Sequence, residues 1–124
     1  MPAKTPEEVD ALFEKYVNAG DLDSLVDLYE PGAALSVAPG EVATGHDEIR
    51  AGLKGFLDAK AHVKLNVTQT ILSGDVAATY NDWSGVMTGA DGSKIEMAGK
   101  AIEIVRKQAD GTWRFIIDDA FARG

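Results

Sequence analysis

The chain contains no cysteine among its 124 residues. Disulfide bonds, thiolate catalysis and zinc sites built from cysteine are therefore excluded. Basic residues are scarce as well: 12 Lys and Arg stand against 20 Asp and Glu, which gives a formal net charge of −8. Nucleic acids and anionic membrane surfaces both select patches of Lys and Arg. We therefore expect neither as a partner.

Long hydrophobic runs are also missing. No window approaches the length of a membrane-spanning segment, and the first residues, Met1-Pro2-Ala3-Lys4-Thr5, lead into a polar helix start without a signal-peptide core. We expect a cytoplasmic protein. Apolar residues nevertheless make up 45% of the chain, which is enough for one domain, residues 1–124, with a real core.

Motifs for metals and cofactors are absent. The two histidines, His46 and His62, stand at a helix start and a strand start, outside any metal-ligand spacing, and we expect both at the surface. The sequence has no phosphate-binding glycine loop and no nucleophile elbow. We therefore expect no metal and no cofactor.

The first part of the chain predicts helices. Thr5-Pro6-Glu7-Glu8 forms a capping box with proline at the first helical position, and apolar residues follow at helical spacing up to Gly20. A shorter helix begins at Asp21, carries Tyr29 on its apolar side and ends at Pro31-Gly32. After two short strands within 33–44, a third helix carries Phe56.

The remainder predicts strands joined by glycine-containing turns: 63–72, 76–88, 94–107 and 112–122. Such turns are typical of an antiparallel meander. Helices followed by a long sheet indicate an α+β domain. The third long strand is apolar on both faces, so one helical layer leaves a face uncovered, most simply for a second copy of the chain. We expect a homodimer.

Two adjacent carboxylates, Asp118 and Asp119, stand inside the apolar run of the last strand. Because successive strand side chains point to opposite faces, the two cannot share one. An unpaired carboxylate in an apolar interior costs several kcal/mol. The inward carboxylate therefore requires a partner, a proton or a function.

The order of elements resembles the nuclear transport factor 2-like superfamily, which includes ketosteroid isomerase, SnoaL-like polyketide cyclases and limonene epoxide hydrolase. The matching features are the helices Thr5–Tyr16 and Asp21–Tyr29, the helix start at Gly45-His46-Asp47-Glu48-Ile49, and the ending Ile104-Val105-Arg106-Lys107 … Asp110-Gly111-Thr112-Trp113-Arg114-Phe115. The resemblance implies a cone-shaped fold, with N-terminal helices packed on a curved antiparallel sheet around an apolar pocket. It does not fix the reaction, because this superfamily carries several chemistries.

The resemblance also implies which side chains face the pocket. The expected inward positions are Tyr80, Asp82 and Ser84; Ala98, Lys100, Ile102 and Ile104; and Arg114, Ile116, Asp118 and Ala120. Asp119 and Trp83 are expected on the convex, dimer-forming side. In this register Lys100 and Asp118 lie on adjacent strands as a partly buried ion pair, with each charge stabilising the other.

Three residues are the catalytic candidates: Asp118 as base, Lys100 as the group that binds an anionic or carbonyl oxygen, and Tyr16 as a neutral hydrogen-bond donor. Alternatively, Lys100 and Asp118 only stabilise the cavity, and Tyr16 is a core aromatic. The ligand-binding candidates are Tyr80, Asp82, Ile102, Ile116 and Phe56.

Neither family template is complete. Ketosteroid isomerase needs a carboxylate base where Ala38 stands and a second acid where Lys100 stands. Limonene epoxide hydrolase uses an Asp–Arg–Asp arrangement. In this chain Ile102 stands where the second carboxylate would be, and Lys100 is a poor substitute for the arginine. The sequence therefore predicts a pocket for a small, mostly apolar molecule with a carbonyl or acidic group, and acid–base chemistry of an isomerase, cyclase or hydrolase. The alternative is a non-catalytic binding or association domain.

Overall fold

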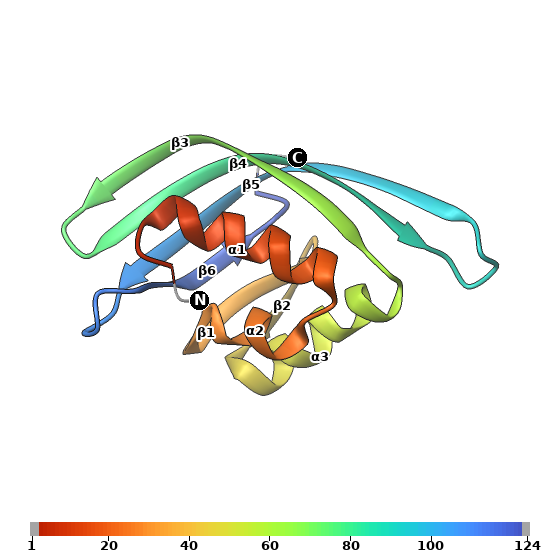
Figure 1. Cartoon of the computed structure of the whole chain (residues 1–124), viewed down its shortest axis with the longest axis horizontal. Helices are drawn as coiled ribbons and strands as arrows, with labels where there is room; N and C mark the ends of the chain where they lie inside the picture. The colour runs from red at the N-terminus through yellow and green to blue at the C-terminus, as the bar shows by residue number, and fades with distance from the viewer. Residues whose placement is uncertain (1–2, 123–124) are drawn as a thin grey trace.

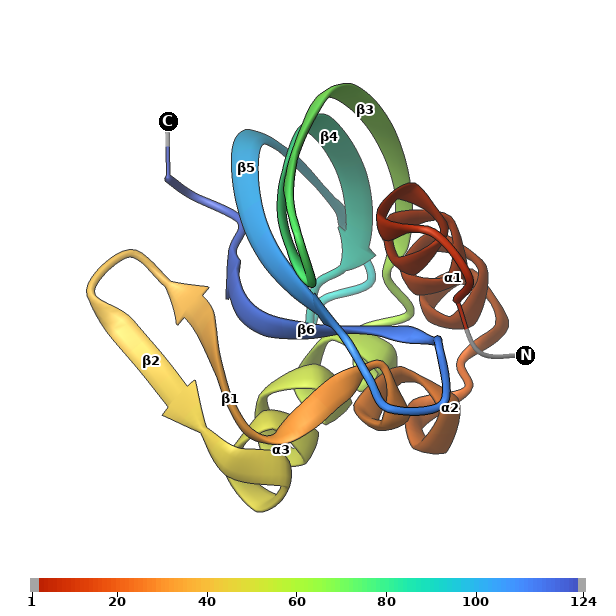
Figure 2. The same cartoon turned by 90° about the vertical axis from the view of Figure 1, so that its left-hand side faces the viewer.

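The computed structural model describes residues 3–122, and this part of the chain forms three helices and six strands. The curved sheet arches over α1, while α2 and α3 lie beside β1 (Figures 1 and 2). The element bounds are α1 Pro6–Ala19, α2 Leu22–Asp27, β1 Tyr29–Ala38, β2 Glu41–Thr44, α3 Gly45–Asp58, β3 His62–Ser73, β4 Val76–Thr88, β5 Lys94–Lys107 and β6 Trp113–Asp119. The expected α+β class is confirmed.

The sheet is mixed, with strand order β2-β1-β6-β5-β4-β3. The predicted antiparallel meander is confirmed for β3 to β6. The sequence did not reveal that β1 runs parallel to β6. This pairing brings the beginning of the sheet next to its last strand, so residues far apart in sequence share one wall.

Helix α1 follows its sequence signals. The Thr5 side chain accepts a hydrogen bond from the Glu8 backbone N–H, and Gly20 ends the helix in the left-handed conformation at φ 70°. The helix then covers edge strand β3, because the Asn18 side-chain amide both donates to and accepts from the backbone of Val63. Edge strands need such cover against pairing with other chains.

The second helix is shorter than predicted. It ends at Asp27, and Tyr29 begins β1, so Tyr29 is not a helix residue. Pro31 lies inside β1 instead of stopping a helix. The strand tolerates it because the β1–β6 pairing is interrupted between Tyr29 and Ala34, where no ladder hydrogen bond is lost.

Strand β6 contains a bulge that determines its inner face. Ile104 pairs with Ile117 and Val105 pairs with Phe115, which leaves Ile116 as an extra residue. As a result Phe115 and Asp118 both lie buried on the inner face, although they are three residues apart. The prediction that Asp118 faces inward is confirmed. The expectation that Arg114 lies on the same face as Asp118 is wrong, because the extra residue Ile116 interrupts the alternation of side chains between them.

Candidate functional site

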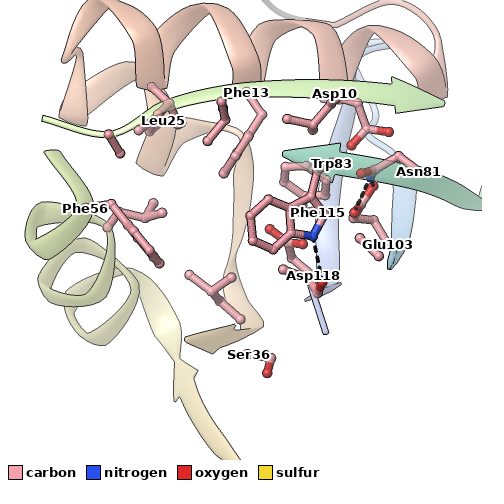
Figure 3. Close-up of a pocket in the computed structure, with 18 of the residues that line it drawn as sticks. Asp10, Phe13, Leu25, Ser36, Phe56, Asn81, Trp83, Glu103, Phe115 and Asp118 are labelled. Carbon is pink, nitrogen blue, oxygen red and sulfur yellow. Dashed lines mark hydrogen bonds between the residues drawn. The ribbon is translucent and has the colours of Figure 1, made fainter. Parts of the chain in front are cut away.

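A pocket lies between α1, α3 and the concave face of the sheet, with a cavity volume of about 80 Å³. Figure 3 shows its labelled side chains reaching inward from both helices and from β4, β5 and β6. Its walls are mostly apolar: Phe13, Val17, Leu25, Leu35, Leu53, Phe56, Leu57, Ala61, Val63, Leu65, Trp83, Met97, Ala101, Phe115, Ala120 and Phe121. The polar lining residues are Asp10, Ser36, Asn81, Glu103 and Asp118. None of these lining residues is basic.

Three carboxyl groups gather at one end of the pocket. Thr79 pairs with Glu103 across β4–β5, and Glu103 pairs with Asp118 across β5–β6. Asp10 reaches the same end from α1 (Figure 3). All three carboxyl residues are at least 95% buried, with exposed fractions of 1%, 2% and 5% for Asp10, Glu103 and Asp118. We call these three residues the carboxyl cluster.

Asp118 has one strong hydrogen-bond partner. The Tyr29 hydroxyl donates to its Oδ2 over 2.6 Å, and Tyr29 is completely buried. Burial raises the pKa of Asp118 to about 7, although the bond from Tyr29 acts in the opposite direction. Burial and the nearby Asp118 charge raise the pKa of Tyr29 well above its usual value, so the phenol stays protonated.

Glu103 is held by two side chains of β4. The Thr79 hydroxyl donates to its Oε1 over 3.0 Å, and the Asn81 amide donates to Oε1 and Oε2 over 2.9 and 2.8 Å. Burial first, and the Asp10 carboxyl second, raise the pKa of Glu103 to about 11. Glu103 therefore carries a proton at neutral pH.

Asp10 is the least satisfied member of the carboxyl cluster. Neither of its carboxyl oxygens receives a hydrogen bond from a fixed donor, and the same is true of Asn81 Oδ1. The groups close enough to donate to Asp10 are a protonated Glu103 and the Thr79 hydroxyl. Burial raises the pKa of Asp10, while its neighbours Glu103 and Thr79 oppose that rise. Buried polar atoms normally have partners, so three such acceptors at one end of a pocket require an explanation.

The predicted inner faces of β4 and β5 are wrong by one residue. The pocket receives Asn81 and Trp83 from β4, and Met97, Ala101 and Glu103 from β5. Strand alternation then puts the expected ligand-binding residues Tyr80, Asp82 and Ile102 on the convex face. Ser84, Ala98 and Ile104 were also expected to face inward, and they lie on the convex face instead. Trp83 was expected on the convex face, and it lines the pocket. Because both faces of β5 carry apolar residues, the pattern did not identify the inner one.

The predicted pair of Lys100 and Asp118 does not form. Lys100 is directly opposite Asp82, and its Nζ lies 3.9 Å from the Asp82 Oδ1, with both side chains about half exposed at 57% and 47%. Asp118 is opposite Glu103 instead. The structure therefore gives the buried carboxylate a tyrosine and a second acid as neighbours.

Of the remaining candidate residues, one lines the pocket and two do not. Phe56 lines the pocket from α3, as expected. Tyr16 is buried in the core but does not line the pocket, and Ile116 is the bulged residue of β6. His46 is half-buried and its Nε2 donates to the Tyr29 carbonyl over 2.7 Å, so it supports β1.

Sequence reasoning missed Asp10, Tyr29, Asn81 and Glu103. A signal existed for two of them. Asp10 stands at helical spacing with Phe13 and Val17, on the face that the pocket uses. Glu103 interrupts an apolar run between Ile102 and Ile104. Tyr29 was hidden because its residue was assigned to a helix.

Within residues 3–122, no set of three or more metal-binding side chains is placed to hold a metal ion. Over the same residues, the helices lack the length and apolar character needed to cross a membrane.

Comparison with known proteins finds one family. The model of the SnoaL-like domain family matches residues 9–116. No curated protein matches the chain.

Solved structures share the fold at low identity. A ketosteroid isomerase-like protein from Erwinia carotovora atroseptica SCRI1043 is 20% identical with a TM-score of 0.80, over 90% of this chain and 88% of that chain. A candidate calcium/calmodulin-dependent protein kinase type II association domain from Thiobacillus denitrificans ATCC 25259 is 20% identical with a TM-score of 0.80, over 98% and 97%. A nuclear transport factor 2-like superfamily protein from Salmonella enterica Typhimurium LT2 is 17% identical with a TM-score of 0.79, over 94% and 88%.

Proposed function

The chain belongs to the SnoaL-like domain family, within the nuclear transport factor 2-like superfamily, and we propose that its pocket binds a small, mostly apolar molecule on which Asp118 transfers a proton. One observation carries the proposal: Asp118 lines an apolar pocket and has a pKa raised to about 7. A group whose pKa lies near the working pH is suited to accept and donate protons. Isomerisation, cyclisation and hydrolysis are the reaction classes that fit.

The neighbours of Asp118 support this role. Ionised Asp118 accepts a proton from a carbon or from a water molecule in the pocket, and the 2.6 Å bond from Tyr29 stabilises the ionised form until then. Tyr29 is a positioning residue, since it lines no part of the pocket. The apolar walls exclude bulk water, which strengthens each electrostatic interaction inside. The ketosteroid isomerase-like neighbour is consistent with such chemistry.

Lys100 and Tyr16 have no part in this proposal. Both were expected to act on the ligand, but neither lines the pocket. The proton transfer therefore depends on Asp118, with the remainder of the carboxyl cluster setting its electrostatic surroundings.

Proton exchange tests the proposal without knowledge of the natural product. Small apolar ketones such as butan-2-one are incubated with the protein in D2O at pH 7, and loss of the α-proton signals is followed by NMR. We expect the wild type to accelerate exchange and Asp118→Asn to slow it at least tenfold. The matched control is Asp58→Asn, a change to an exposed carboxylate on α3. Equal rates for wild type and Asp118→Asn on every compound that binds would contradict the proposal.

We also propose that the convex face of the sheet joins two copies of the chain. A continuous cross-strand row runs over four strands of this face: Ile71, Ala78, Ile104 and Ile117. Its end members Ile71 and Ile117 are 48% and 49% exposed. Contiguous exposed apolar side chains indicate an interaction surface. The association-domain neighbour supports contact between copies.

Oligomeric state tests this second proposal. Light scattering coupled to size exclusion should give the mass of two chains for the wild type and of one chain for Ile104→Lys. Val42→Lys, a charge on an exposed residue of β2, is the control and should leave the mass unchanged. A monomeric wild type at high micromolar concentration would rule the dimer out.

A further inference from the structure

The polar end of the pocket offers hydrogen-bond acceptors that have no donors. Both Asp10 oxygens and Asn81 Oδ1 are buried and unpartnered. Asp10 is 1% exposed and Asn81 is fully buried, and both line the pocket. Figure 3 shows the Asp10 carboxyl pointing from α1 toward Asn81 and Glu103. What is missing at this position is a donor.

The other members of the carboxyl cluster do not supply enough donors. Asp118 has Tyr29, and Glu103 has Thr79 and Asn81, as its own partners. The proton on Glu103 can serve one oxygen of Asp10, and the single Thr79 hydroxyl proton, which is also near Asp10, is already donated to Glu103. The second oxygen of Asp10, and Asn81 Oδ1, still remain without one.

The charge of the lining side chains also favours a ligand that donates hydrogen bonds. The lining contains Asp10, Glu103 and Asp118 and no basic residue. An ionised carboxylate taken out of water without a cation costs several kcal/mol, and this cost is what raises the pKa of Asp10. A bound cation would stabilise the ionised form of Asp10. A water molecule would donate hydrogen bonds to Asp10 but would bring no positive charge. An ammonium group provides both the N–H donors and the positive charge.

The walls of the pocket suit a cation with an apolar body. Five aromatic side chains line the pocket: Phe13, Phe56, Trp83, Phe115 and Phe121. Aromatic faces attract ammonium groups and also pack against alkyl chains. The cavity volume of about 80 Å³ limits the ligand to a compact molecule.

We propose that the pocket binds a small apolar amine in its ammonium form, with its N–H groups donating to Asp10 and Asn81. This inference rests on the pocket of the proposed function but names a different ligand class from the sequence-based one. The carbonyl or acidic ligand was expected because Lys100 and Tyr16 were to donate to it, and neither lines the pocket. An acid would add a negative charge to a lining that already carries three carboxyl groups.

An isosteric series tests the ligand class, by NMR on the wild-type protein and by fluorescence on a single-tryptophan variant. The probes are sec-butylamine, butan-2-ol, butan-2-one and isobutyrate, which present a cation, a neutral donor, an acceptor and an anion on bodies of similar size. Binding is measured by ligand-observed NMR and by the fluorescence of Trp83 in a Trp113→Phe background, where Trp83 is the single tryptophan. We expect the amine to bind at least tenfold more tightly than the ketone and the anion. A ketone or anion that binds as tightly as the amine, or an amine that does not bind, overturns the inference.

Variants locate the ammonium group. Asp10→Asn keeps the side-chain shape and should weaken amine binding at least tenfold, while its thermal midpoint without ligand stays equal to that of the wild type or rises. A residue with a purely structural role would instead lose stability. Asp58→Asn should bind the amine as the wild type does, and Asp10→Ser replaces Asp10→Asn if that variant does not fold. Unchanged amine affinity in the folded Asp10 variant overturns the assignment of Asp10.

The two proposals fail separately. Amine binding without any proton exchange in the presence of Asp118 would preserve this inference and contradict the proposed reaction. If a ketone exchanged its protons in a way that depends on Asp118 and no amine bound, the proposed reaction would be preserved and the amine inference contradicted.

Discussion

Glu103 and Asp118 are direct cross-strand partners on the inner face of the sheet. Both are buried, so two acids share the position where an acid and a lysine were expected. Like charges so close cannot both ionise without cost. Burial, the hydrogen bond with Asp10 and the Asp118 charge, in that order, raise the pKa of Glu103 to about 11, so it retains its proton, while burial raises the pKa of Asp118 to about 7.

The raised pKa of Asp118 makes part of the stability depend on pH. Its folded value of about 7 lies above the unfolded value of about 3.9. Between these values the folded state binds more protons, so this contribution is complete below about pH 4 and is lost as pH rises through 7. Urea unfolding from pH 4 to 8 should show the stability difference between wild type and Asp118→Asn fall by about 1 kcal/mol per pH unit. A flat difference would show that the Asp118 pKa is not raised.

Removing the Tyr29 hydroxyl should move the pKa of Asp118 upward. Tyr29→Phe keeps the ring and deletes the one donor to Asp118 Oδ2, and that bond lowers the pKa of Asp118 in the wild type. The loss of a buried hydrogen bond to a charged group should also destabilise the fold by about 1–3 kcal/mol above pH 7. Carbon-13 NMR of the aspartate carboxyl groups measures the shift directly. If the titration midpoint of Asp118 did not rise, the bond would not be the factor that holds it down.

Gly99 should resist substitution because it supports Trp83. A Cβ atom at Gly99 would lie 2.8–2.9 Å from three atoms of the indole ring. Trp83 is also fixed by its Nε1, which donates to the Ala120 carbonyl over 2.8 Å. Gly99→Ala should therefore cost about 1–3 kcal/mol and change the Trp83 emission. The control Gly55→Ala, where a Cβ meets nothing within 4 Å, should be neutral or stabilising by up to about 1 kcal/mol.

Lys100 should couple weakly to Asp82 and not at all to Asp118. Its Nζ lies 3.9 Å from Asp82 in an exposed pair, and such pairs contribute at most about 1 kcal/mol. Double-mutant cycles of Lys100→Met with Asp82→Asn and with Asp118→Asn separate the two cases. A coupling of several kcal/mol with Asp118 would restore the pairing first inferred from the sequence.

The elements could be predicted from the sequence because their signals are local. The capping box at Thr5 and the glycine turns between β3 and β6 depend on neighbouring residues alone. The fold class followed from their order, and it is confirmed. The parallel pairing of β1 with β6 left no such signal, since it joins segments from opposite ends of the chain.

The site could be predicted only in part, for two physical reasons. Asp118 was correctly placed inward, but the bulge at Ile116 changes which residues accompany it, and no local signal marks that bulge. The interior also contains polar side chains: Thr79 and Asn81 both donate to Glu103 there. Hydrophobic alternation therefore did not mark the inner face of β4 and β5, and the register implied by the family resemblance was wrong there by one residue.

The hydrogen bond between Tyr29 and Asp118 has a consequence for how the protein is made. The two residues are 89 positions apart, and contacts between distant residues form slowly because a long loop must first close. Strand β6 leaves the ribosome after the other five strands. Until then β1 has an open edge and the pocket lacks the wall that holds Asp118. We therefore expect Asp118 to reach its place in the pocket wall in one of the last steps of folding.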